Sequence, residues 1–155
     1  MGRYIDDILQ PGEKVLYSSN LHRIIYWKAI LAWIAACTLL VLSRTTLAEN
    51  LILLYLASAA VVTLAALYWS LAAWFRRWTT ETDVTNLRVI YKEGFITRKT
   101  FELSVDKVAS VGVEQSILGR ILNYGDVVIE NMGNDKQKIE TIAAPLNFRN
   151  AITAR

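Results

Sequence analysis

The sequence contains very little of what disulfides and metal sites are made of. Its 155 residues include one cysteine, Cys37, and one histidine, His22. A single cysteine cannot form an intramolecular disulfide. One cysteine and one histidine are also too few ligands for a Cys/His zinc site. We therefore expect no metal site and no disulfide.

An excess of charge of one sign is also missing. Lysine and arginine number 17 and acidic residues number 14, which leaves a formal net charge of +3. From residue 76 onward acids and bases alternate closely, as they do on an ordinary solvated surface. A nucleic-acid-binding protein would carry a dense basic face. We therefore expect no nucleic-acid partner.

The patterns that carry enzyme chemistry are absent as well. The glycines are isolated and form neither a phosphate-binding loop nor a dinucleotide-binding pattern. Ser104, Ser110 and Ser116 have no histidine in the same part of the chain to act as a base. His22 lies just before the first apolar run and is more typical of an interfacial residue than of a catalyst. We expect no enzymatic activity and no cofactor.

What the sequence does have is two long apolar runs. Residues 24–42 are interrupted only by Lys28, and residues 51–75 contain no charge. As helices these runs would be roughly 28 and 37 Å long, against a hydrocarbon core of about 30 Å. The short connector 43–50 would make them antiparallel neighbours. This predicts a transmembrane hairpin at residues 24–75, preceded by a cytoplasmic segment, 1–23, and followed by a cytoplasmic domain, 76–155.

The orientation of the hairpin follows from its flanking charges. The connector has one basic residue, Arg44, whereas several lysines and arginines flank the other ends of the two runs. The positive-inside rule then predicts a multi-pass protein with both termini in the cytoplasm. A competing interpretation is a lipoprotein signal ending at Cys37. We favour the span, because the apolar run continues to Leu42 and a polar segment precedes it.

Small residues recur on one face of each apolar run. Such seams allow close helix packing in lipid. The simpler interpretation is that they hold the hairpin together, and the alternative is that they drive self-association. The residues are Ala59, Thr63, Ala66 and Ser70 in the second run, and Ala29, Ala32 and Ala36 in the first.

The remaining residues show the alternation and turn signals of short strands. A short helix is expected within 115–123, and a closing helix from Pro145 onward. The expected strands are residues 79–83, 88–92, 95–105, 108–114, 126–132 and 136–142.

Three segments resemble one known family. Residues 85–91 (TNLRVIY) with Gly94, residues 115–127 (QSILGRILNYGDV), and the leader at 4–7 and 12–15 are similar to small two-span members of the bacterial pleckstrin-homology-like, or membrane-flanked, domain family. The likeness covers nearly the whole chain, and 115–127 is its most specific part. It implies an α+β fold in the bacterial inner membrane: a transmembrane helical hairpin followed by a small PH-like, partly open β-barrel with a C-terminal helix.

The resemblance implies no particular activity, because a fold carries little function by itself. The final segment is short for a PH capping helix. We therefore hypothesise that a neighbouring copy or residues 1–22 complete the barrel. The favoured function is a non-enzymatic inner-membrane protein that presents its domain for protein–protein interaction or self-assembly. The alternatives are an accessory subunit of a larger membrane complex, and an oligomeric channel or transporter.

Two groups of residues are candidate contact sites, and the expected partners are membrane lipid, a second copy and other membrane subunits. The basic group fits docking on anionic lipid, although fixing the topology is the simpler role for Arg76 and Arg77. The apolar group fits a partner contact if it is exposed, and a core position otherwise. The basic group is Arg76, Arg77, Lys92, Arg98 and Lys99, and the apolar group is Ile117, Leu118, Ile121 and Leu122.

Overall fold

The chain forms two compact units, which the computed structural model describes over residues 5, 8–46, 48–94 and 99–154. One unit is the helical segment Arg23–Phe75. The other combines Met1–His22 with Arg76–Arg155, from both sides of that segment. Within the described residues the architecture is α+β, with two long apolar helices, two antiparallel sheets and a C-terminal helix. This confirms the fold class expected from the sequence.

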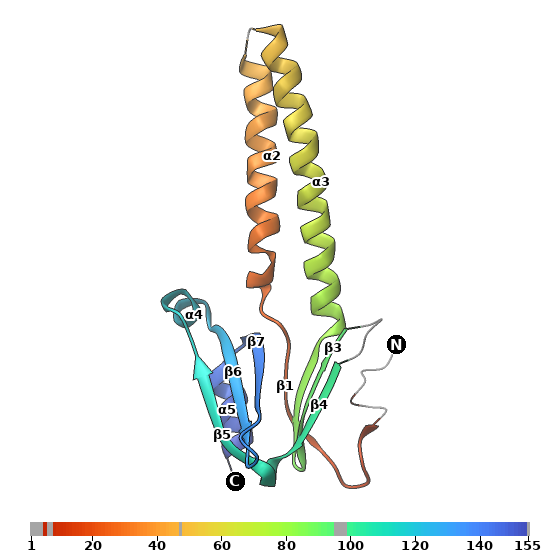
Figure 1. The fold of residues 1–155 in the computed structure, drawn as a ribbon, viewed down its shortest axis with the longest axis vertical. Coiled ribbons are helices and arrows are strands. Elements are labelled where there is room, and N and C mark those ends of the chain that lie inside the picture. The colour runs from red at the N-terminus through yellow and green to blue at the C-terminus, as the bar shows by residue number, and fades with distance from the viewer. Residues whose placement is uncertain (1–4, 6–7, 47, 95–98, 155) are drawn as a thin grey trace. The chain divides into compact units, whose positions relative to one another are not determined.

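The helical unit is a hairpin (Figure 1). A 3-10 turn, η1 (Arg23–Tyr26), leads into α2 (Trp27–Thr45), and α3 (Glu49–Thr79) returns antiparallel beside it. In the described part of the chain these two helices are long and apolar enough to cross a membrane. Only 17% and 11% of their most apolar windows are buried, so they are not the core helices of a globular domain. The pair suits a membrane protein.

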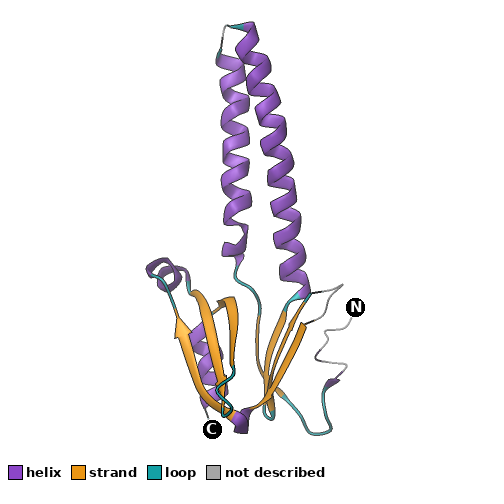
Figure 2. Ribbon diagram, viewed as in Figure 1, coloured by secondary structure: helices purple, strands orange, loops and turns teal. Residues whose placement is uncertain are grey.

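The described part of the domain consists of two sheets and several short helices (Figure 2). The first sheet has the order β1-β2-β3-β4 and the second has the order β5-β6-β7, with all neighbours antiparallel. The helix α4 connects β5 to β6, and α5 follows β7. The strands are β1 (Val15–Ser19), β2 (Glu81–Thr85), β3 (Arg88–Glu93), β4 (Lys99–Ser104), β5 (Val108–Glu114), β6 (Tyr124–Asn131) and β7 (Lys136–Ala143). The short helices are η2 (Val105–Lys107), α4 (Ile117–Leu122) and α5 (Pro145–Thr153).

The segment before the hairpin is part of the domain. Its strand β1 pairs with β2, with Ser19 opposite Thr82. The hairpin is therefore inserted in the connection between two neighbouring strands. The same segment also reaches the second sheet, because the Ser19 hydroxyl donates to the Ala143 carbonyl at 2.9 Å and the Ala143 N–H donates to the Asn20 carbonyl. Of the two hypotheses for completing the barrel, these contacts agree with the one that uses residues 1–22.

A buried carboxylate holds the leader in place. Glu13 has no exposed side-chain surface and pairs with Arg88 at 3.0 Å. Its carboxylate also accepts from the Thr85 hydroxyl at 2.7 Å and from the Gln10 N–H at 2.9 Å. Burial alone would raise the pKa of Glu13, but the hydrogen bonds from Arg88, Gln10 and Thr85 outweigh it and lower the pKa. The charged form is therefore the one the fold favours.

The core lies between the two sheets, under α5. This helix contacts β5 and β6 of one sheet and β1 and β2 of the other. Phe148 and Ile152, which share a face as expected, are both buried. Phe148 meets Tyr17 of β1 edge to face, with ring centroids 6.3 Å apart. The other buried members of this cluster are Val84, Val89, Tyr91, Leu103, Val127, Ile129, Ile139 and Ile142.

The predicted strand boundaries differ from the structure where the hairpin joins the domain. We expected a strand at 79–83, but α3 continues to Thr79 and β2 begins at Glu81. The hydroxyls of Thr79 and Thr80 both donate to the Arg76 carbonyl, so these threonines extend the helix end instead of starting the strand. The expected strand 95–105 is described only from Lys99 onward, since 95–98 lie outside the described residues.

Candidate functional site

The helix α4 carries a cluster of exposed apolar side chains, which we call the α4 surface. Ile117, Leu118, Ile121 and Leu122 are 81%, 62%, 72% and 45% exposed. The sequence left open whether these residues form core or contact, and in the domain they are exposed. The physical reason is Gly119, which is buried against the chain. A Cβ at Gly119 would lie 2.6 Å from the Tyr124 carbonyl oxygen, so the helix rests on its glycine and its large side chains point away.

The α4 surface is held by a specific set of hydrogen bonds. The Ser116 hydroxyl caps the helix by accepting from the Gly119 N–H at 3.0 Å, and Asn123 ends it in the left-handed conformation. The Gln115 side-chain amide donates to the Tyr124 carbonyl at 3.0 Å and to the Gly119 carbonyl at 3.3 Å. The exposed cluster is therefore part of an ordered turn.

The chain leaves the domain next to the end of α4, and on its return it contacts β3 and β7. His22 precedes the hairpin, and its N–H donates to the Thr141 carbonyl at 2.8 Å. The His22 ring stacks on Tyr124, with centroids 5.1 Å apart. Arg76 follows the hairpin and pairs with Glu140, the neighbour of Thr141, at 3.6 Å. Both junctions with the hairpin thus meet one short stretch of β7, at the end of β6 where α4 finishes.

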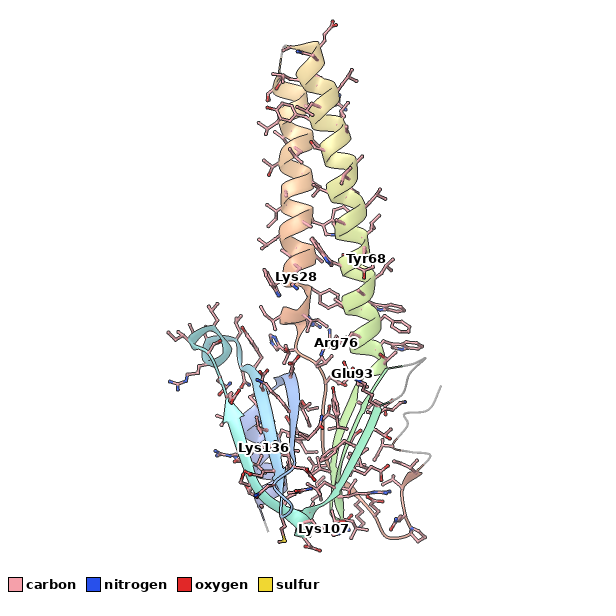
Figure 3. The ribbon with its side chains drawn as sticks, viewed as in Figure 1. Lys28, Tyr68, Arg76, Glu93, Lys107 and Lys136 are labelled. Carbon is pink, nitrogen blue, oxygen red and sulfur yellow. The ribbon has the colours of Figure 1, made fainter. Side chains whose placement is uncertain are left out.

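Two of the four described basic candidates pair with carboxylates. Arg76 contacts Glu93 at 3.1 Å as well as Glu140, as Figure 3 shows for Arg76 and Glu93. Lys92 lies 3.8 Å from Glu81. Arg77 is half-buried and Lys99 is exposed, whereas Arg98 lies outside the described residues. The described members therefore do not converge on one free basic face.

A cleft of about 390 Å³ opens between β3, β4 and β7. At its wall the Tyr91 hydroxyl donates to Glu93 at 2.9 Å. Burial raises the pKa of Tyr91, and the hydrogen bond to Glu93 raises it further. Positive and negative groups alternate around the cleft, so it has no strong preference for a ligand of one charge. Its lining residues are Arg76, Tyr91, Glu93, Lys99, Thr100, Phe101, Gln137, Lys138 and Glu140.

The small-residue seam lies inside the helical unit. Ala59 and Ala66 are buried. The Thr63 hydroxyl donates to the Ala59 carbonyl, and the Ser70 hydroxyl donates to the Ala66 carbonyl. Ser70 also accepts a hydrogen bond of 3.2 Å from the Trp33 indole of the other helix. This placement favours the role of holding the hairpin together. The small residues of the first helix, Ala29, Ala32 and Ala36, are buried as well.

The described residues bring together no group of three His, Cys, Asp or Glu side chains that could hold a metal ion. The residues that sequence reasoning missed are Gln115, His22 with Tyr124, and Glu13 with Arg88. Each acts through a contact with a residue that is distant in sequence or through a backbone carbonyl, so local patterns do not reveal it.

Comparison with known proteins places nearly the whole chain in one family. A family model described as "Bacterial PH domain" matches residues 24–152. No curated protein and no solved structure matches the chain. The match includes the hairpin and the domain strands that follow it.

Proposed function

Since the chain belongs to the bacterial PH domain family, we propose that it is a non-enzymatic, membrane-anchored binding module. Domains of this family are generally non-catalytic. The observation that carries the proposal is the α4 surface, where four large apolar side chains are exposed on an ordered six-residue helix. Clustered exposed apolar side chains mark interaction sites.

The proposed location is the bacterial inner membrane, with α2 and α3 spanning it and both termini in the cytoplasm. The support is the length and apolar character of the two helices together with the bias of basic residues away from the connector. A cysteine at Asn50 in a Cys37→Ala background should react with a membrane-impermeant thiol reagent added to intact spheroplasts. A cysteine at Lys136 should react only after the membrane is opened. The reverse pattern would contradict the orientation.

The function of the domain is then to make contacts at the cytoplasmic face. Another protein, a second copy and lipid are the three classes of partner that this role admits. Docking on anionic lipid through Arg76 and Lys92 has weak support, because each of them already contacts a carboxylate. The α4 surface is the better candidate contact, since burying apolar side chains is favourable for any of these partners.

Photo-crosslinking from the α4 surface in native membranes tests the proposal. A photoreactive residue replaces Ile117, and the matched control replaces Met132, which is 72% exposed in the turn between β6 and β7. We expect adducts, with protein or with lipid, from position 117 and not from position 132. Equal yields at both positions would contradict a dedicated surface.

The same preparations separate the alternatives. Stoichiometric foreign subunits that co-purify in mild detergent would make the protein an accessory subunit of a larger membrane complex. Ion flux through vesicles that contain the purified protein alone would make it a channel or transporter.

A further inference from the structure

We propose that the partner of the α4 surface is the membrane interface itself, so that the domain has a second, apolar attachment to the bilayer besides the hairpin. This inference rests on the proposed anchoring of the hairpin in a membrane. The apolar side chains of the α4 surface would enter the lipid headgroup layer, and this would not require anionic lipid.

α4 ends next to His22, the last residue of the domain before the hairpin. Tyr124, two residues after the end of α4, stacks on His22, and the hairpin begins at the next residue, Arg23. On the other junction, Arg76 contacts Glu140, one residue from the Thr141 carbonyl that accepts from His22. The end of α4 therefore lies beside the point at which the chain leaves the domain for the hairpin. A span that starts at Arg23 brings this end of the domain to the membrane surface.

The other end of the domain carries a contrasting exposed apolar residue, Met132. β6 runs from Tyr124 to Asn131, and at about 3.3 Å per residue its ends are roughly 25 Å apart. Met132 follows its far end, where its N–H donates to the Lys107 carbonyl. Figure 3 shows Lys107 at the opposite end of the domain from Arg76 and Glu93. Met132 is thus an exposed apolar side chain at the end of the domain opposite Arg76 and Glu93.

The side chains in and around α4 suit the headgroup layer of a membrane. Residues 115–123 contain no acidic side chain and one base, Arg120, which is exposed. The carboxylates of Glu114 and Asp126, which flank this stretch, both contact Lys138, at 3.1 and 2.9 Å. An apolar helical face with an adjacent base and a nearby tyrosine is the composition of elements that enter the headgroup layer.

The α4 surface is small. Its four side chains on a helix of six residues are far fewer than the roughly 20–30 residues that each partner contributes to a standard protein–protein interface. A tethered domain needs no such area at a membrane, because the hairpin already supplies a high effective concentration of lipid. The observations therefore favour lipid over a protein as the occupant.

Depth-dependent quenching in the full-length protein tests the inference. In a Cys37→Ala background, Ile121→Cys and the matched control Met132→Cys, both at positions 72% exposed, carry the same nitrobenzoxadiazole label. Each protein is placed singly in phosphatidylcholine nanodiscs, with or without nitroxide-labelled lipid, so that a second copy cannot cover the surface. We expect severalfold stronger quenching at position 121 than at position 132, and the same ratio when phosphatidylglycerol is added.

A second variant shows whether the protein or the label drives insertion. Ile117→Asp with Leu118→Asp should release the label at position 121 and bring its quenching close to that at position 132. The thermal unfolding midpoint should stay unchanged, because both side chains are exposed. Quenching that persists in this variant, that needs phosphatidylglycerol, or that is equal at positions 121 and 132 would overturn the inference.

Together, the quenching and crosslinking experiments distinguish a failure of the lipid partner from a failure of the proposed function. Protein adducts from position 117 in native membranes, without lipid quenching at position 121, would overturn lipid as the partner and leave the binding module standing. If position 117 gives no adducts and position 121 shows no quenching, both the lipid partner and the binding module are overturned.

Discussion

Glu13 and Arg88 form a bidentate ion pair. They are 75 residues apart in the sequence, and the whole hairpin lies between them along the chain. The Arg88 Nε and Nη2 atoms donate to the two carboxylate oxygens at 3.0 Å each. A further guanidinium nitrogen, Nη1, reaches Glu102 at 2.7 Å, and Nη2 also donates to the Ile8 carbonyl. The hydrogen bond with Glu13 is the main reason that the pKa of Arg88 is raised. Arg88 thus joins the leader, β3 and β4.

A domain cut from the chain after the hairpin should therefore fail to fold. The fragment 76–155 lacks β1, so the edge of β2 is unpaired and Arg88 loses its buried partner. Joining residues 1–22 to 76–155 through a short glycine–serine linker should restore a cooperative unfolding transition, since Ser19 and Thr82 are already neighbours. Circular dichroism during heating distinguishes the two proteins. A cooperative transition in the fragment 76–155 alone would contradict the role of β1.

Glu13→Gln in the linked domain should lower the free energy of unfolding by about 3 kcal/mol, because it removes the buried carboxylate that pairs with Arg88 and leaves only the partly exposed Glu102 to balance that charge. Urea titration measures the change. The matched control is Glu114→Gln, which breaks an exposed pair with Lys138 and should cost less than about 1 kcal/mol. Similar losses in the two variants would rule out a special role for Glu13.

The same pair predicts an acid-dependent stability. The folded-state pKa of Glu13 lies below its ordinary value of 4.5, so the folded protein holds this proton less tightly than the unfolded chain does. The stabilisation is therefore present above the unfolded-state pKa and is lost as pH falls through the folded-state pKa. The difference in unfolding free energy between the parent and Glu13→Gln should narrow below about pH 4.5. A difference that stays constant to pH 3 would disprove the assignment.

Gly119→Ala should displace α4. The new Cβ would meet the Tyr124 carbonyl oxygen, and a backbone atom cannot move aside cheaply. We expect a loss of about 1–3 kcal/mol in stability and a changed amide resonance for Tyr124 in the linked domain. Gly112→Ala is the control, because its Cβ would find ordinary contacts near 3.9 Å. Equal effects of the two substitutions would show that the close approach at Gly119 is unimportant.

Ala66→Leu should push the two helices of the hairpin apart. Ala66 is fully buried, one turn before Ser70, which bonds to Trp33 of the other helix. A cysteine pair at 33 and 70, in a Cys37→Ala background, should be joined within one chain by a short bifunctional thiol reagent, because the Trp33 indole bridges these positions. Ala66→Leu should abolish most of that crosslinking. Leu64→Ala, at a position 67% exposed, should leave the yield unchanged. A seam that drives only self-association would give crosslinks between chains instead.

The parts of the fold that the sequence predicts are those with a local signal. The two helices follow from runs without charge, and β5 was expected at 108–114, where the structure places it. The leader strand β1 has no such signal, since Val-Leu-Tyr-Ser-Ser is short and its partner β2 lies beyond the hairpin. Pairing over that separation depends on tertiary context, which periodicity does not contain.

The α4 surface illustrates the same limit at the candidate site. Four apolar residues at helical spacing usually mark the buried face of a helix. Here Gly119 turns the other face inward, because the backbone of Tyr124 is too close for any side chain. The spacing predicts the helix correctly, but the direction it faces is set by a contact with a residue on the next strand.

The position of β1 has a consequence for how the protein is made. β1 is synthesised before α2, yet its partner β2 is not available until the ribosome has passed α3. At about 5–20 residues per second, translating the chain between Ser19 and Thr82 takes several seconds. During that time the nascent leader has no strand to pair with. The first sheet can therefore close only after both helices of the hairpin have been made.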